Sequence, residues 1–184
     1  MAVLTEREAR EIVDRIMGAA SADATVAALS SREGGNIRFA NNGVTTSGEI
    51  ADVTVRVTSA FGTRRGTAET NVVDPEALTE VVRRAEQAAR RAPEDPEYVP
   101  PLAPVEYPRP QGWFDSTAVY GPDERAAAAA AAIGAATSRE VLLAGFLENY
   151  ATALATASST GLFGYHHETW LEYTNTARTP DARG

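Results

Sequence analysis

The feature that most constrains this chain is a run of prolines between residues 93 and 110. Seven of the ten prolines in the sequence lie there. Because proline lacks a backbone N–H and fixes φ, the run is excluded from helix interiors and from the middle of a sheet. We expect an extended, largely polyproline-like segment. It could link two domains or cross one as a strap, and we favour a strap because the sequence after it is too short to fold alone.

The sequence before the prolines predicts two helices with strands between them. Thr5 and Glu8 form a capping-box pattern, and apolar residues then recur at helical spacing up to about residue 20. Asp74 and Pro75 mark the start of a second helix, since aspartate caps and proline fits the first helical position. Between the helices, residues 52–59 alternate valine with polar residues, as a strand with one buried face does.

Turn signals divide the region between these helices into short strands. Gly34-Gly35 predicts one turn and residues 62–66 predict another. Asn41-Asn42-Gly43 predicts a tight hairpin, because Asn-Gly tolerates positive φ.

After the prolines, a helix is expected near Gly121-Pro122, continuing through the alanines at 126–132. Three strands follow, over 141–150, 151–157 and 162–176, with turns at Glu148-Asn149 and over 158–161. The last strand lies near the end of the sequence, so we expect an open sheet edge.

This order of elements predicts an α+β fold. About three helices pack on one side of one or more mostly antiparallel sheets, because the connections are hairpin-short. We interpret residues 1–184 as one domain, made of a helix–strands–helix block (1–92), the proline-rich strap (93–112) and a helix-plus-strands block (113–184).

Composition excludes several classes of protein. The 184 residues carry a formal net charge of −8 and contain no cysteine, which excludes disulfides, thiolate zinc sites and a cysteine nucleophile. The acidic balance argues against nucleic acid as a partner. No apolar run approaches the roughly 18 residues of a membrane-spanning helix, and residues 1–7 lack the apolar core of a secretory signal. We therefore expect a cytoplasmic protein without membrane contact.

The two histidines of the sequence are adjacent, in His166-His167-Glu168. In a strand, His166 and Glu168 would share one face with Trp170, and His167 would face the other way with Tyr165. At most one histidine and one glutamate converge, so we interpret the motif as a polar sheet face. A metal site completed across a dimer interface is the alternative.

Other polar clusters suggest surfaces rather than chemistry. Residues 158–161 are interpreted as a hairpin turn rather than a nucleophile turn, and residues 62–66 as a hairpin tip with an anion contact as the alternative. Trp113-Phe114 is expected to pin the strap to a sheet. The polar hairpin supplies our candidate substrate-binding residues, Arg38, Asn41, Asn42 and Thr45. No catalytic residue and no metal ligand is assigned.

Taken in order, these segments resemble a known family. They are the run from Arg38 to Gly48, the valine strand, Gly62 to Asn71, Asp74-Pro75-Glu76-Ala77-Leu78 with its helix, the proline strap, and the run from Ala157 to Leu162. The order resembles the amino-terminal half of the TldD/PmbA family, also called modulator of DNA gyrase, and more closely its PmbA (TldE) branch.

The resemblance implies a role in proteolysis in the bacterial or archaeal cytoplasm. Family members form TldD–TldE assemblies that cleave unfolded or leader-bearing peptides, and an HExxxH helix in the TldD-type carboxy-terminal half binds zinc. The present sequence has no HExxxH. We therefore expect no cofactor in this chain, and zinc only in a catalytic partner.

The function expected from the resemblance is a non-catalytic amino-terminal part of a TldE/PmbA-like subunit, which shapes the chamber and guides peptides. Its expected partners are a TldD-like subunit or a carboxy-terminal half of its own, a peptide substrate, and further copies in a homo- or hetero-oligomer. The alternative is a stand-alone interaction protein that binds a partner or regulates a peptidase without catalysis.

Overall fold

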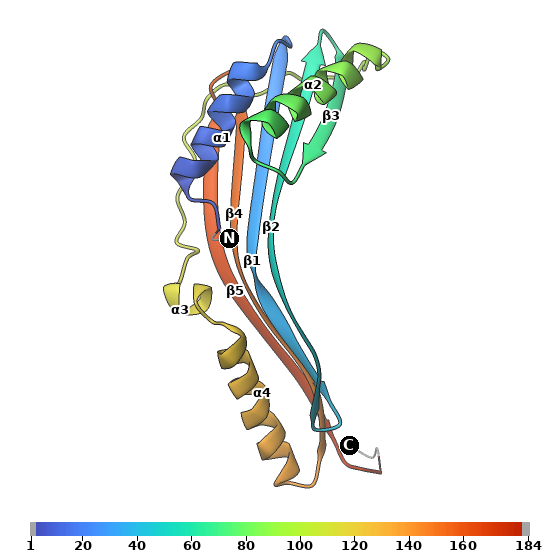
Figure 1. Ribbon diagram of the computed structural model, residues 1–184, viewed down its shortest axis with the longest axis vertical. Helices are drawn as coiled ribbons and strands as arrows, with labels where there is room; N and C mark the ends of the chain where they lie inside the picture. The colour runs from blue at the N-terminus through green and yellow to red at the C-terminus, as the bar shows by residue number, and fades with distance from the viewer. Residues whose placement is uncertain (1–2, 182–184) are drawn as a thin grey trace.

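The computed structural model describes residues 3–181 of the chain. Its main feature is a long, curved, five-stranded sheet (Figure 1). The strand order is β3-β2-β1-β4-β5, and all neighbours pair antiparallel. Four strands have 16 to 19 residues and the edge strand β3 has 7. Their bounds are β1 Ala24–Ala40, β2 Gly43–Phe61, β3 Arg64–Thr70, β4 Leu142–Ser158 and β5 Phe163–Arg178.

The longer helices lie on one face of this sheet, which we call the inner face; the opposite face is the outer face. They are α1 (Glu6–Ala19), α2 (Pro75–Arg91) and α4 (Pro122–Thr137). In Figure 1, α1 and α2 cover the upper half of the sheet and α4 lies beside the lower half. The predicted α+β class, with an antiparallel sheet and helices on one side, is confirmed. A short helix, α3 (Asp115–Ala118), was not predicted.

The predicted start signals of the first two helices are confirmed. At α1, the Thr5 N–H donates to Glu8 Oε2 at 2.9 Å, and the Thr5 hydroxyl accepts from the Glu8 N–H. At α2, Asp74 Oδ1 accepts from the Ala77 N–H at 2.7 Å, and Pro75 occupies the first helical position. Each side chain therefore satisfies an amide that the helix leaves unpaired.

Two predicted turns are wrong, because β1 and β4 continue through them. At Gly34-Gly35, a Cβ on Gly34 would lie 2.8 Å from the Tyr150 ring, and one on Gly35 would lie 2.7 Å from Nη2 of Arg125. The carbonyl oxygens of Asn149 and Gly48 would lie closer still, at 2.1 and 2.4 Å, so these glycines make room for neighbouring backbone and side chains rather than forming a turn. The predicted Glu148-Asn149 turn fails because Asn149 is buried in the strand, where its side chain bonds α4. The hairpin over Asn41-Asn42-Gly43 is confirmed, with φ of 50° and 59° at the two asparagines.

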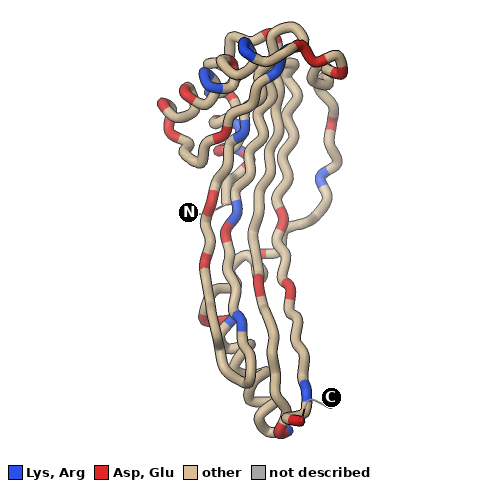
Figure 2. The backbone as a smooth tube through the Cα atoms, turned by 90° about the vertical axis from the view of Figure 1, so that its right-hand side faces the viewer, with Lys and Arg blue, Asp and Glu red and all other residues tan. Residues whose placement is uncertain are grey.

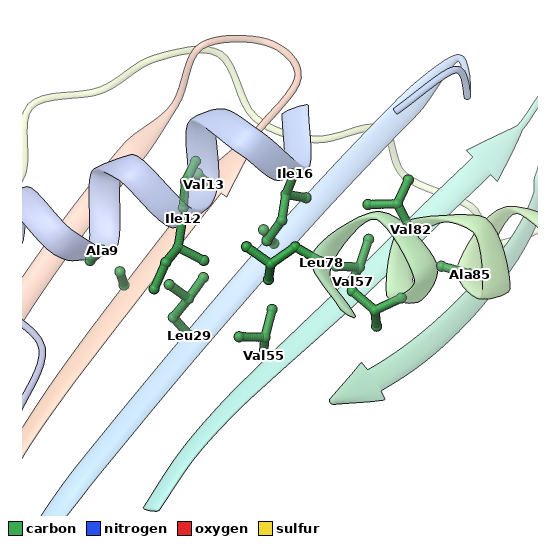
Figure 3. Close-up of a cluster of buried hydrophobic side chains, with 14 of the residues drawn as sticks. Ala9, Ile12, Val13, Ile16, Leu29, Val55, Val57, Leu78, Val82 and Ala85 are labelled. Carbon is green, nitrogen blue, oxygen red and sulfur yellow. The ribbon is translucent and has the colours of Figure 1, made fainter. Parts of the chain in front are cut away.

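The inner face carries two apolar clusters, one under each group of helices. The upper cluster joins α1 and α2 to β1 and β2, and Figure 3 shows Ile12, Ile16 and Leu78 pointing from the helices toward Leu29, Val55 and Val57. The lower cluster packs Ala129 and Ala136 of α4 onto Ile37, Phe39, Leu143 and Leu147. The small alanine side chains bring α4 close to the sheet, as the alanine run suggests.

The proline strap passes the sheet on the side opposite α1 and α2 (Figures 1 and 2). It begins beside the β2–β3 turn, where the Asp95 N–H donates to the Thr63 carbonyl at 3.3 Å. Farther along, the Leu102 carbonyl accepts from the Thr160 hydroxyl at 2.6 Å. It ends at the β5 edge, where the Thr169 N–H donates to the Gly112 carbonyl at 2.9 Å. The strap thus connects the two parts of the chain that build one sheet.

Within residues 3–181, no helix combines the length and the apolar character that crossing a bilayer requires.

Candidate functional site

The strap and the outer face of the sheet enclose a groove of about 620 Å³, which we call the strap groove. One wall is formed by Tyr107, Pro108 and Pro110 of the strap. The floor is largely apolar and comes from β1, β2, β4 and β5; its residues include Ala28, Leu154, Thr156 and Gly164. A groove with apolar walls and few polar groups suits an apolar side chain or ligand.

Small residues in the sheet create the space for this groove. A Cβ on Gly164 would lie 2.9 Å from the Tyr107 ring, so the missing side chain lets the ring lie against β5. Leu154 keeps 46% of its surface exposed although its strand, β4, is paired on both sides, with β1 and with β5. Arg56 and His166 add cationic or polar groups at the border, and Arg56 donates from Nε to Glu69.

A second cavity of about 320 Å³ lies where the strap turns around the β5 edge. It shares Pro110, Tyr165 and His166 with the strap groove. The Tyr165 hydroxyl, which lines it, donates to the Leu4 carbonyl at 2.8 Å. Burial raises the pKa of Tyr165, and the nearby carboxylates of Glu6 and Glu8 raise it further. Tyr165 is therefore held as a neutral hydrogen-bond donor at neutral pH.

The two histidines point to opposite faces of β5, as the strand alternation predicts. His166 lines the strap groove, with Nε2 at 3.4 Å from Glu168 Oε2. His167 stacks on Trp113 with ring centroids 4.9 Å apart and contacts the Tyr165 ring at 5.7 Å. This stacking pins the end of the strap to the sheet, the role expected for Trp113. Among residues 3–181, no group of three or more histidine, cysteine or acidic side chains is placed to hold a metal ion.

The polar hairpin lies at the opposite end of the sheet from the strap groove (Figure 1). Asn42 uses its side chain to hold β4: Nδ2 donates to the Val141 carbonyl at 2.8 Å, and Oδ1 accepts from the Leu143 N–H at 2.7 Å. Thr45 donates to the Arg38 carbonyl at 3.2 Å. The structure therefore gives Asn42 a structural contact, while substrate contact by Arg38, Asn41, Asn42 and Thr45 stays a prediction.

The remaining polar turns are tied to the strap. At the β4–β5 turn, the hydroxyls of Ser158 and Thr160 lie 2.7 Å apart, and Thr160 also reaches the strap. At the β2–β3 turn, Arg64 and Arg65 pair with Glu94 and Asp95 at the start of the strap, at 3.3 and 2.8 Å. Both turns thus fix the upper part of the strap in place.

Sequence reasoning missed one buried polar network. Arg125, in the first turn of α4, is 1% exposed and donates to Asn149 Oδ1 at 2.6 Å and to the Tyr120 carbonyl at 3.0 Å. It also forms an ion pair with Glu49 of β2. The sequence shows only that Arg125 directly precedes an alanine run, and that position by itself does not indicate burial.

Comparisons with known proteins agree with this architecture. Residues 26–89 match the family model described as PmbA/TldA metallopeptidase domain 1. No curated protein matches the sequence.

Among solved structures, TldE from Thermococcus kodakarensis has a similar fold, with a TM-score of 0.76 and 14% identity over 94% of this chain and 42% of that one. A protein described as a modulator of a DNA gyrase from Thermotoga maritima gives a TM-score of 0.71 and 14% identity, over 95% of this chain and 44% of that one. One from Bacteroides thetaiotaomicron gives 0.70 and 13%, over 93% and 41%.

The chain therefore spans about two fifths of the length of these structures, 41% to 44%. The matched segment covers most of β1, all of β2 and β3, and most of α2. Residues 26–89 thus match the first domain of the PmbA/TldA family model, and the chain as a whole has a fold like that of the amino-terminal domain of TldE.

Proposed function

We propose that this chain is the non-catalytic amino-terminal part of a TldE/PmbA-like subunit in a TldD/TldE-type zinc metallopeptidase complex. The observation that supports this most directly is the fold shared with a TldE over 94% of the chain. In this role the chain shapes the chamber and guides unfolded or leader peptides toward the active site.

Catalysis is assigned to another polypeptide. The two histidines of the sequence are adjacent and point to opposite faces of β5, so they do not supply the two ligands of an HExxxH helix. A TldD-like subunit would hold the zinc ion. The contribution of this chain would be to bind and orient the peptide.

The strap groove is the part of the surface best suited to hold a peptide side chain. Its wall of Tyr107, Pro108 and Pro110 and its floor at Leu154 offer apolar contacts that tolerate many sequences. Arg56 and His166 at the border could bind backbone carbonyls or an acidic group. Such a mixture fits unfolded peptides, which share apolar side chains rather than a single sequence.

The test is co-expression with a TldD-like subunit, followed by co-purification and cleavage of an unfolded substrate peptide. We expect a stable complex and faster cleavage than with the TldD-like subunit alone. Leu154→Glu should slow cleavage without preventing assembly. Leu102→Glu is the matched control, because Leu102 is 68% exposed on the strap and does not line the groove.

The proposal fails if the two proteins neither assemble nor change cleavage. Assembly without any change in cleavage would favour the stand-alone interaction protein instead.

A further inference from the structure

We propose that the free edge of β5, residues 170–178, is a dimerisation edge that pairs antiparallel with the same segment of a second copy of this chain. The twofold axis passes Asn175. This inference does not rest on the proposed function, because it uses only the backbone, charge and exposure of β5.

The backbone of this edge has unused hydrogen-bonding groups. In the part of the chain that the structure describes, β5 is the outermost strand on its side of the sheet, and β4 alone pairs with it. The Thr169 N–H points away from β4, since it donates to Gly112 of the strap at 2.9 Å. Because outward and inward groups alternate along an antiparallel strand, Leu171, Tyr173 and Asn175 also point outward. Among residues 3–181, no backbone hydrogen bond reaches these outward groups.

The hydrogen-bonding pattern limits the registers that two such edges can adopt. An axis at Asn175 places Asn175 opposite its own copy and Tyr173 opposite residue 177 of the second copy. All of these are outward-pointing residues, so they form hydrogen-bonded pairs. The Thr169 N–H is already bonded to the strap and is not available to a second copy. A register centred on Asn175 uses only residues beyond Thr169, which lie in the free edge.

This register also pairs opposite charges. Glu172 lies opposite Arg178 of the second copy, and the twofold axis repeats the contact. Both belong to non-hydrogen-bonded pairs, in which side chains are closest, with Cα atoms about 4.5 Å apart.

Within residues 3–181, neither of these two charges, Glu172 and Arg178, has an ion-pair partner. Glu172 instead lies opposite Glu148 of β4, a like-charge arrangement that disfavours the pairing, and Arg178 lies opposite Leu142. An arginine from a second copy would offset the Glu148–Glu172 repulsion.

The apolar side chains of this segment are exposed as well. Leu171 and Tyr173 keep 43% and 40% of their surface exposed. The reason is that α4 packs on β1, β4 and β2 and leaves the lower part of β5 uncovered. Soluble proteins seldom leave a long apolar edge strand open, because it pairs readily with other strands. Pairing with a second copy would shield these side chains and complete the backbone hydrogen bonds.

Sedimentation equilibrium of the 184-residue chain tests the proposal. We expect a monomer–dimer equilibrium, in which Glu172→Arg or Arg178→Glu alone raises the dissociation constant at least about tenfold, since each change places two like-charged pairs across the axis. The double variant with both changes should return the constant to within about threefold of the original. Glu97→Arg makes the same charge change on the strap and should leave it unchanged.

Because the chain has no cysteine, disulfide trapping can test the register. Asn175→Cys places one thiol opposite its own copy, at a Cα separation of about 5.5 Å that a disulfide can span. It should form a covalent dimer under mild oxidation at least about tenfold faster than Thr174→Cys, which lies opposite residue 176 of the second copy.

Four results would overturn the proposal, and the first three concern this chain by itself. They are a wild-type chain that stays monomeric at about 100 µM, charge reversals without effect on the dissociation constant, and equal trapping of both cysteine variants. Protection of the β5 amides that appears only on mixing with a TldD-like subunit would also overturn it, because the edge would then belong to a different partner.

Discussion

Arg125 donates a hydrogen bond from Nη1 to Oδ1 of Asn149 at 2.6 Å, which joins the first turn of α4 to the middle of β4. The Asn149 amide continues the network by donating to the Thr117 carbonyl of α3 at 3.1 Å. Both side chains are at least 98% buried, so their polar atoms depend on one another for partners. This pair is the polar centre that fixes α3 and α4 against the lower half of the sheet.

Replacing Arg125 with methionine should therefore destabilise the fold. It leaves Asn149 Oδ1 and the Tyr120 carbonyl without their donor in a buried site, which we expect to lower the free energy of unfolding by about 2–4 kcal/mol. Urea denaturation gives the measurement. Arg7→Met is the matched control, because Arg7 is 77% exposed in an i,i+4 pair and should change stability by less than about 0.5 kcal/mol. Equal effects of the two substitutions would contradict this role of Arg125.

The sequence predicted correctly those features that depend on interactions between residues close together in the chain. The capping pattern at Thr5 and Glu8 and the positive-φ turn at Asn41-Asn42 depend on a few adjacent residues, and both are confirmed. Gly34-Gly35 gave the same local signal as a turn, yet the strand continues through it. A side chain at either glycine would collide with Tyr150 or Arg125, which lie far away in the sequence. The sequence pattern alone does not distinguish a glycine required by a backbone turn from a glycine required by the close approach of a neighbouring residue.

The candidate site was less predictable for the same reason. The strap groove exists because Tyr107 lies on Gly164 and because Leu154 faces it from β4, and these residues belong to separate segments. The alternation of His166 and His167 was predictable, since it follows from the strand period of two. The contact of His166 with Glu168 was also predictable, because the two residues are two positions apart on one strand. The stack of His167 on Trp113 was not, because it depends on the path of the strap.

Two glycine-to-alanine substitutions should have opposite effects on stability. A Cβ on Gly66 of β3 would lie 2.1 Å from the backbone nitrogen of Ala89 in α2, so Gly66→Ala forces two packed backbones apart. We expect a loss of at least about 2 kcal/mol. Gly134 lies in α4, and a Cβ there would meet no neighbouring atom within 4 Å, so Gly134→Ala should add about 0.5–1 kcal/mol through helix propensity. Thermal unfolding of both variants makes the comparison, and a loss at Gly134 would contradict it.

The strap groove should lose affinity for peptides when its aromatic wall is removed. Tyr107→Ala takes away a half-exposed ring that lies on Gly164, while the strap keeps its hydrogen bonds at Leu102 and Gly112. We expect a three- to tenfold weaker affinity for an apolar-rich unfolded peptide, about the contribution of one aromatic contact. Fluorescence anisotropy gives the measurement. Tyr98→Ala, on the same strap but outside the groove, should leave the affinity unchanged, and equal losses would place the binding site elsewhere.

The capping box of α1 should make part of the stability depend on pH. The Thr5 hydroxyl and backbone hydrogen bonds lower the pKa of Glu8 below its ordinary value of about 4.3. A carboxyl whose pKa is lower in the folded state stabilises above its unfolded pKa, and this contribution is lost as the pH falls through the folded value. Glu8→Gln should therefore lower the free energy of unfolding by about 0.5–1 kcal/mol at pH 7, with the difference shrinking below about pH 4.3. Urea denaturation at pH 7 and at about pH 3 would measure it, with Glu11→Gln as a control one turn along the helix. A Glu8→Gln difference that stays constant between the two pH values would show that the carboxylate charge does not stabilise this cap.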